Sequence, residues 1–236
     1  MTTRENELGQ PIGPEVPGWT PRFRPPRAAM QGRYCRVEPL DPARHARELH
    51  EANSLDREGR MWTYLFSGPF ASFDDYRAWV DAKQGSEDPL FFAFVDAASG
   101  RAVGLGSYLR IDPSNGTVEV GHLQFSPLMQ RTAVATEAMY LMMKTAFGLG
   151  YRRYEWKCDA LNAGSRSAAE RLGFRFEGIF RQAIVYKGRS RDTAWYSVID
   201  KEWPALEAAF GAWLDPANFD AGGRQRRSLV ELRTAR

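Results

Sequence analysis

The chain has few cysteines, little net charge and no long apolar run, and each of these features excludes a class of protein. Cys35 and Cys158 are the only two cysteines in 236 residues, and they lack metal-ligand spacing. Neither a disulfide framework nor a metal site is therefore predicted. The net charge of +3 is too small to argue for nucleic-acid binding. No apolar run approaches the roughly 20 residues that a membrane helix requires.

The composition fits one large domain with short extensions. Hydrophobic residues make up 43% of the chain, which supports a core. We assign residues 1–32 to a proline-rich N-terminal arm, 33–215 to the domain and 216–236 to an arginine-rich basic tail,. The first seven residues are polar and partly acidic, so we expect no signal peptide and a cytoplasmic protein with both thiols reduced.

Predicted strands precede and follow one strand–helix–strand unit. The strands are 33–40, 90–95, 102–109, 117–125, 154–158, 181–186 and 193–199,. Capping residues and apolar spacing predict helices that begin at Asp41, at Ser72 and after the loop 132–136, and a further helix at 203–214,. This order predicts an α+β fold, with a mixed, mostly antiparallel central sheet flanked by helices.

A loop of small residues follows the predicted strand at 117–125. Pro127 cannot donate to a β-ladder, so the strand should end before it. Residues 132–136 then open a helix, whose first N–H groups have no partner within the helix. Together with the helix dipole and the charge of Arg131, these groups predict an anion-binding site. An ordinary strand–loop–helix unit without a ligand would show the same pattern.

Two spaced motifs in this region resemble the GNAT superfamily of N-acetyltransferases. Gln130-x-x-Ala133-x-Ala135 is similar to its pyrophosphate-binding motif, with Ala133 in place of the central glycine. The loop must therefore be built without a positive φ at Ala133. Asn162-x-x-Ser165, followed by Leu172-Gly173-Phe174, resembles the next motif of the superfamily.

Two further patterns are most similar to one branch of that superfamily. Glu119-Val-Gly and Ala135-Thr136-Glu137-Ala138 resemble the ribosomal-protein alanine N-acetyltransferase-like branch. The resemblance covers roughly residues 33–200 and implies a single GNAT-like domain. It also implies acetyl transfer from acetyl-CoA, as cosubstrate and without a metal, to a primary amine of a small molecule or of a protein N-terminus.

The resemblance implies a set of coenzyme-binding residues on the strand, the loop and the second motif. Backbone groups near Gln124 and Phe125 would pair with pantetheine, and Asn162 suits a pantetheine amide because it both donates and accepts. The full set is Gln124, Phe125, Gln130, Arg131, Thr132, Ala133, Val134, Ala135, Thr136, Asn162 and Ser165.

Three residues are candidates for proton transfer. Glu119 and His122 are the candidate bases, and alternation on a regular strand would place them on opposite faces. The branch resemblance favours Glu119, and a buried core histidine is the alternative for His122. Many members of the superfamily place a tyrosine four residues before the Gly-Phe pair, where this chain has Ala169. Ser165 is therefore the candidate proton donor, with a helix N-cap as the alternative.

The acceptor side is less defined by the sequence. Trp62, Tyr64 and Tyr186 are candidate substrate contacts, with core aromatics as the alternative. We expect neither a membrane nor a nucleic acid as a partner, and a homodimer stays open. Two other functions also stay open: a coenzyme-binding module without catalysis, and a ribosome- or RNA-associated protein that uses the arginine-rich tail.

Overall fold

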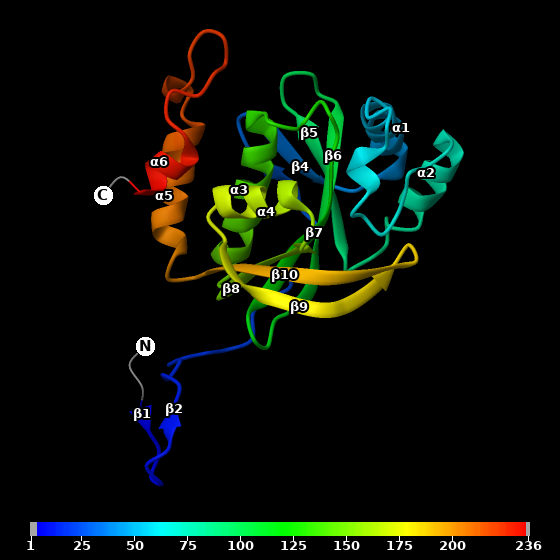
Figure 1. The fold of residues 1–236 in the computed structure, drawn as a ribbon. Helices are drawn as coiled ribbons and strands as arrows, with labels where there is room; N and C mark the ends of the chain where they lie inside the picture. The colour runs from blue at the N-terminus through cyan, green and yellow to red at the C-terminus, as the bar shows by residue number, and fades with distance from the viewer. Residues whose placement is uncertain (1–3, 235–236) are drawn as a thin grey trace.

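The computed structural model describes residues 4–234, which form a mixed sheet between two layers of helices (Figure 1). Eight strands lie in the order β3-β4-β5-β6-β7-β8-β10-β9. Their bounds are β3 Met30–Gln31, β4 Cys35–Pro39, β5 Leu90–Asp96, β6 Ala102–Asp112, β7 Thr117–Phe125, β8 Arg153–Asp159, β9 Arg175–Tyr186 and β10 Arg189–Ile199. All neighbouring strands are antiparallel except β7 and β8. The predicted fold class is confirmed.

Helices cover both faces of the sheet. One face packs against α3 (Ala133–Gly148), α4 (Ala163–Arg171) and α5 (Trp203–Leu214). The other face packs against α1 (Pro42–Asn53) and α2 (Phe73–Asp81), which are joined through the short helix η1 (Arg60–Trp62). Asp41 and Ser72 cap α1 and α2 through their side chains, as the sequence predicts.

The parallel pair in the centre of the sheet separates towards its carboxyl end. Strands β7 and β8 pair from Thr117 opposite Arg153 to Val120 opposite Trp156. Beyond Val120, β7 continues to pair only with β6. The backbone edge of β7 that faces β8 is therefore open from Gly121 onwards, and the two strands splay apart next to the start of α3.

The arm and the tail extend the domain in different ways. A two-stranded hairpin, β1 (Arg4–Glu5) and β2 (Pro11–Ile12), projects away from the sheet (Figure 1). After it, Trp19 is anchored because its Nε1 donates to the carbonyl of Ser114 at 2.9 Å. The tail carries η2 (Pro216–Asn218) and α6 (Leu229–Thr234). Part of this tail packs on the domain, because Leu229 of α6 is 1% exposed and belongs to the core.

Candidate active site

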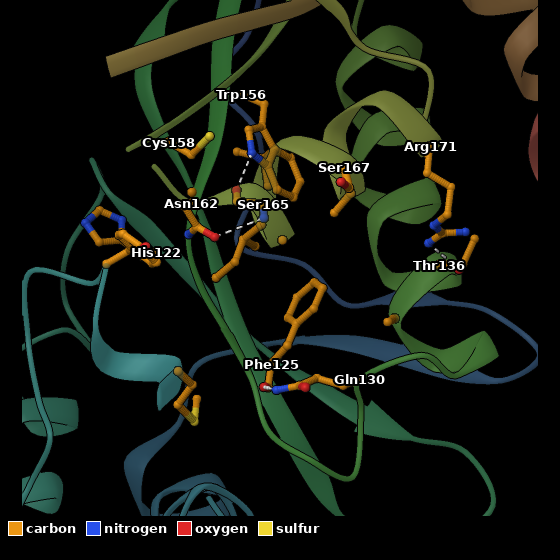
Figure 2. A pocket seen from close by; sticks show the side chains of 18 of the residues that line it. His122, Phe125, Gln130, Thr136, Trp156, Cys158, Asn162, Ser165, Ser167 and Arg171 are labelled. Carbon is orange, nitrogen blue, oxygen red and sulfur yellow. Dashed lines mark hydrogen bonds between the residues drawn. The ribbon is translucent and has the colours of Figure 1, made fainter. Parts of the chain in front are cut away.

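A cavity of about 1640 Å³ occupies the gap between β7 and β8. Its lining includes the start of α3, the start and end of α4, and the face of the sheet that carries Glu119 and His122. Figure 2 shows His122 and Arg171 on opposite sides of it, with Trp156 and Ser165 between them. This volume exceeds the roughly 300–1,000 Å³ of an ordinary small-molecule pocket, so the cavity has room for two substrates at once.

The first turn of α3 has no side-chain cap, whereas α4, which also lines the cavity, has one. Within residues 4–234, no hydrogen bond satisfies the backbone N–H groups of Ala133, Val134 and Ala135. The hydroxyl of Thr132, which precedes them, points back and donates to the carbonyl of Met129 at 2.6 Å. By contrast, the side chain of Asn162 caps α4. Three free donors at the positive end of a 16-residue helix form a site for an anion.

The loop before α3 has alanine in place of the central glycine of the motif, and its residue with a positive φ lies elsewhere. Ala133 is the first residue of α3, and the positive φ of 61° falls on Arg131 instead. Gln130 holds the loop against β7, because its Nε2 donates to the carbonyl of Phe125 at 2.8 Å (Figure 2). The expectation that Ala133 needs no positive φ is therefore confirmed.

Arg171 and the C-terminal segment also line the cavity, and the sequence analysis missed both. Nη2 of Arg171 donates to Oγ1 of Thr136 at 3.0 Å, and no carboxylate of residues 4–234 forms an ion pair with it. The cavity wall continues through Trp213, Phe219, Arg224 and Gln225, among others. The segment is fixed in place, because Nε1 of Trp213 donates to Oε1 of Gln225 at 2.8 Å. The signal for Arg171 is that it faces a cavity and has no acidic partner among the described residues. A sequence does not show either property.

Ser165 lies in the centre of the cavity but does not cap α4. Its backbone N–H donates to Oδ1 of Asn162 at 3.0 Å, and its Oγ accepts from Nε1 of Trp156 at 2.9 Å (Figure 2). Asn162 is therefore the cap, and the N-cap alternative for Ser165 is wrong. The amide nitrogen of Asn162 has no partner among the described residues. Ala169, at the place of the superfamily tyrosine, is completely buried.

Glu119 is part of a chain of ion pairs at the cavity wall. Its carboxylate is 5% exposed, contacts Nη1 of Arg110, and lies 2.9 Å from Nζ of Lys157. Lys157 is equally buried and also pairs with Glu155 at 2.7 Å. The ring of Trp195 lies 3.6 Å from the same ammonium. The network fixes the Glu119 carboxylate between two cations at the cavity wall.

A bulge places His122 on the same face as Glu119, contrary to our alternation argument. The pairing shifts between Ser107–Gly121 and Leu105–Gln124, so β7 contains one extra residue there. His122 takes a φ of 52° in this bulge, and such insertions re-aim side chains. Both residues line the cavity. A regular strand would separate them, but this strand is not regular.

The imidazole of His122 has one engaged nitrogen and one free nitrogen. Oγ of Ser107 lies 2.8 Å from Nδ1 and donates to the carbonyl of Gly121 at 3.3 Å. Nε2 has no hydrogen-bond partner among the described residues. Burial, with the charges of Lys83 and Arg110, lowers the pKa of His122 to about 4. The ring is therefore neutral at pH 7.

The other predicted residues divide between the cavity wall and the core. Tyr64 lines the cavity, and its hydroxyl donates to the carbonyl of Leu161 at 3.2 Å. Trp62 and Tyr186 are 5% and 6% exposed and do not line it. Gln124 is also buried and accepts from the hydroxyl of Tyr76 at 3.2 Å. Of the residues predicted in the coenzyme loop, Gln130, Arg131, Thr132, Ala133, Ala135 and Thr136 line the cavity and Val134 does not. The prediction of a loop at 132–136 is wrong from Ala133 onwards, because α3 begins there.

Neither a metal-binding cluster nor a membrane-spanning helix occurs among the described residues. No group of three or more His, Cys, Asp or Glu side chains in residues 4–234 could hold a metal ion. No helix in the same range has the length and apolar character needed to cross a membrane. Cys35 and Cys158 are both buried and free.

Comparisons with known proteins identify the family of the chain. A family model described as an acetyltransferase (GNAT) domain matches residues 36–175. A crystal structure of a GCN5-related N-acetyltransferase from Brucella melitensis is 50% identical, with a TM-score of 0.91 over 93% of this chain and 100% of that one. A probable GNAT-family acetyltransferase from Chromobacterium violaceum is 40% identical, with a TM-score of 0.77 over 83% and 98% of the two chains.

A more distant relative belongs to the same class. The uncharacterized N-acetyltransferase YnaD of Bacillus subtilis is 23% identical over 150 residues, which are 62% of this chain and 84% of YnaD. The finer placement in the ribosomal-protein alanine branch stays a prediction. The family match covers more than half of the chain, and it includes β7, β8, α3 and α4, which line the cavity. The chain belongs to the GNAT acetyltransferase family and is an acetyl-CoA-dependent acyltransferase.

Proposed function

We propose that this enzyme transfers the acetyl group of acetyl-CoA to a primary amine, of a small molecule or of a protein N-terminus, by direct attack with general-base assistance. One observation carries the proposal. The unsatisfied N–H groups of Ala133, Val134 and Ala135 stand at one end of a cavity that reaches Glu119 and His122 through the β7–β8 gap. An anion site and candidate bases in one cavity suit a phosphate-bearing acetyl donor and an amine.

The chain's own residues account for each part of the coenzyme. The pyrophosphate would accept from the free N–H groups of α3 and from Arg131. The pantetheine arm, which carries amides, would pair with the open edge of β7 at Phe125 and with the free amide nitrogen of Asn162. The nucleotide end would then lie under the C-terminal segment, beside Arg171. These contacts would place the thioester in the gap between the strands.

We assign the chemical steps to side chains that line the gap. Glu119 would take one proton of the incoming ammonium. After the amine has added, Ser165 would give its hydroxyl proton to the leaving thiolate and recover a proton from the nitrogen of the new amide. His122 is a second candidate for the base because it lies on the same face and its Nε2 is free. The acceptor amine attacks the thioester carbon, the C–S bond breaks, and the products are the acetylated amine and coenzyme A.

Ala133→Asp tests the coenzyme site directly. A carboxylate at the first position of α3 would stabilise the helix through its dipole, so the variant should fold. It would also repel the pyrophosphate, and calorimetry should show acetyl-CoA binding weakened by about 100-fold or more. Ala133→Ser adds a neutral side chain at the same place and should bind nearly as well as the wild type. Equal affinity of the Asp and Ser variants would refute the assignment.

A further inference from the structure

Arg191 is a buried cation that the fold does not pair with an acid. It lies on β10 and is 6% exposed. Its Nε donates to Oγ1 of Thr193 at 3.1 Å, which is its one hydrogen bond among the described residues. No carboxylate of residues 4–234 lies within 4.0 Å of it. A buried charge without a partner costs several kcal/mol, so an arginine in this state needs another role.

The nearby acids are engaged elsewhere. The carboxylate of Asp159 accepts from the hydroxyl of Tyr186 at 2.8 Å and from the backbone N–H of Leu161 at 2.9 Å. Asp192 accepts from the backbone N–H of Gln182 at 2.7 Å. The fold does pair the other buried cation of this region, because Lys157 contacts both Glu119 and Glu155. Of these two buried cations, only Arg191 therefore lacks an acidic partner among the described residues.

Arg191 lies at the end of the cavity where β7 and β8 have separated. Thr193, to which Arg191 is bonded, pairs with Asp159, the last residue of β8. This is the level at which β7 and β8 have separated. Arg191 lines the cavity there, and its guanidinium carbon lies 5.6 Å from the ring centre of Phe66. A bound group at Arg191 would thus stand beside the thioester and not at the phosphate end.

The hairpin of β9 and β10 is hydrogen-bonded to residues 62–68 beside Arg191. Nζ of Lys187 donates to three carbonyls at the end of η1 and in the loop after it, those of Trp62 at 2.8 Å, Ser67 at 3.1 Å and Gly68 at 2.6 Å. Arg189 donates to a fourth, of Thr63, at 2.7 Å. These two cations are therefore occupied, and the loop confines the space over Arg191. A confined site with one unpaired positive charge suits a small ligand with one negative charge.

We propose that the acceptor is a small amine that also bears a carboxylate, such as an amino acid, and that Arg191 binds this carboxylate. The inference rests on the proposed function and narrows its acceptor. The planar guanidinium offers two parallel N–H donors to a carboxylate. One arginine matches the single charge of a carboxylate better than the double charge of a phosphate. The carboxylate of the acceptor would be the counter-ion that Arg191 lacks among the described residues. It would also orient the amine towards the gap between β7 and β8.

The test compares matched acceptors that differ only in this charge. Release of the coenzyme A thiol from acetyl-CoA is measured with L-amino acids, with the carboxamide of each, and with peptides that carry an acidic second residue and an amidated C-terminus. The best amino acid should exceed its carboxamide in kcat/KM by roughly 10- to 100-fold. Arg191→Gln should lower only the reaction of the acid, so that the ratio approaches one. Arg191→Lys should keep part of the ratio.

Two controls separate this inference from a folding defect and from the proposed function itself. Arg181→Gln removes an exposed arginine on β9 and should leave the ratio unchanged. Acetyl-CoA should bind Arg191→Gln as it binds the wild type. Carboxamides used as well as acids, or an equal loss for both in Arg191→Gln, would overturn the inference while leaving the acetyl-CoA site intact. Dependence confined to the acidic peptides would overturn the assignment to a small molecule.

A binding measurement covers the case in which the panel supports no turnover. The melting temperature of the protein is then measured with coenzyme A and each acid or carboxamide. The acid that binds should raise the melting temperature of the wild type but not of Arg191→Gln. If no acid stabilises the wild type more than its carboxamide does, the inference is wrong.

Discussion

Nη2 of Arg171 donates to Oγ1 of Thr136 at 3.0 Å, so the last residue of α4 is bonded to the first turn of α3 (Figure 2). Burial lowers the pKa of the Arg171 guanidinium, which shows that its surroundings disfavour the charge. Nη1 of Arg233, from α6, donates to the carbonyl of Arg171 at 2.8 Å. The C-terminal helix thus fixes the backbone of an arginine that lines the cavity beside the start of α3.

Arg171→Ala should weaken acetyl-CoA binding by about 10-fold or more, because a charge-assisted hydrogen bond to phosphate is worth about 1.5–3 kcal/mol. Calorimetry with acetyl-CoA measures it. Arg175→Ala is the matched control, since Arg175 is four residues further on and forms an exposed ion pair with Glu202 at 2.8 Å. Its affinity should not change. A wild-type affinity in Arg171→Ala would remove Arg171 from the coenzyme site.

The regular elements could be predicted because their sequence signals are local. Thr117–Phe125 and Trp203–Leu214 match the predicted strand and helix residue for residue, since alternation, Pro127 and apolar spacing mark their ends. The strand predicted at 181–186 is longer, because β9 begins at Arg175. Its side chains are mostly exposed, so no periodic burial pattern announced its first half.

The site could be predicted only where a motif carries it. The loop Gln130–Thr136 and Asn162 were recognisable by spacing, and most of these residues line the cavity. The bulge at His122 was not, because an extra residue in one strand is visible only against the partner strand. Arg171, Arg191 and the C-terminal wall depend on distant contacts. An unpaired arginine looks the same in a sequence as one that is paired.

Glu137→Ala should destabilise the fold severely. The carboxylate of Glu137 in α3 accepts from the backbone N–H groups of Arg33, Tyr34 and Cys35, at 2.9, 2.5 and 2.7 Å. Its loss would leave buried donors without a partner, at a cost of about 3–5 kcal/mol. Urea unfolding measures this cost.

The control for Glu137→Ala is an acid of α5 whose contact is exposed. Glu207 lies 3.7 Å from Lys144 near the surface, so Glu207→Ala should cost about 0.5 kcal/mol or less. A similar small loss in Glu137→Ala would mean that the N–H groups of residues 33–35 find other acceptors.

His122 should make the stability of the fold depend on pH. Its pKa is about 4 in the fold and about 6.5 in an unfolded chain. Between these values the unfolded chain binds a proton that the folded chain does not. The stabilisation is therefore complete above pH 6.5 and is lost as the pH falls towards 4. From pH 7 to pH 4.5 it amounts to about 2–3 kcal/mol.

Comparison with His122→Gln isolates this contribution. The free energy of unfolding in urea is measured for both proteins at pH 7 and pH 4.5. His45, whose pKa is also lowered by burial, and the carboxylates act equally in both proteins. The wild type should lose about 2–3 kcal/mol more than His122→Gln does. Equal losses would mean that His122 is exposed to protons in the fold.

The choice of base can be decided by two substitutions that keep shape and hydrogen bonding. Glu119→Gln should lower kcat by about 10²–10⁴-fold, the usual range for a general base. Acetyl-CoA affinity should hardly change, because Glu119 lies far along β7 from the loop at 130–136. The acidic limb of the pH–rate profile should also disappear. His122→Gln should cost less, because the ring is a weak base when its pKa is near 4.

The ion pairs of Glu119 require a further readout. Glu119→Gln would leave Arg110 without a carboxylate partner and Lys157 with Glu155 alone, so a fall in kcat could come from misplaced cations. Lys157→Met separates the two causes, because it breaks the contact at 2.9 Å and keeps the carboxylate. If the carboxylate itself is the base, Lys157→Met should retain the acidic limb that Glu119→Gln loses. If Glu119→Gln keeps the wild-type kcat while His122→Gln abolishes activity, the free Nε2 of His122 is the base. If neither matters, the amine arrives neutral and the site acts by positioning.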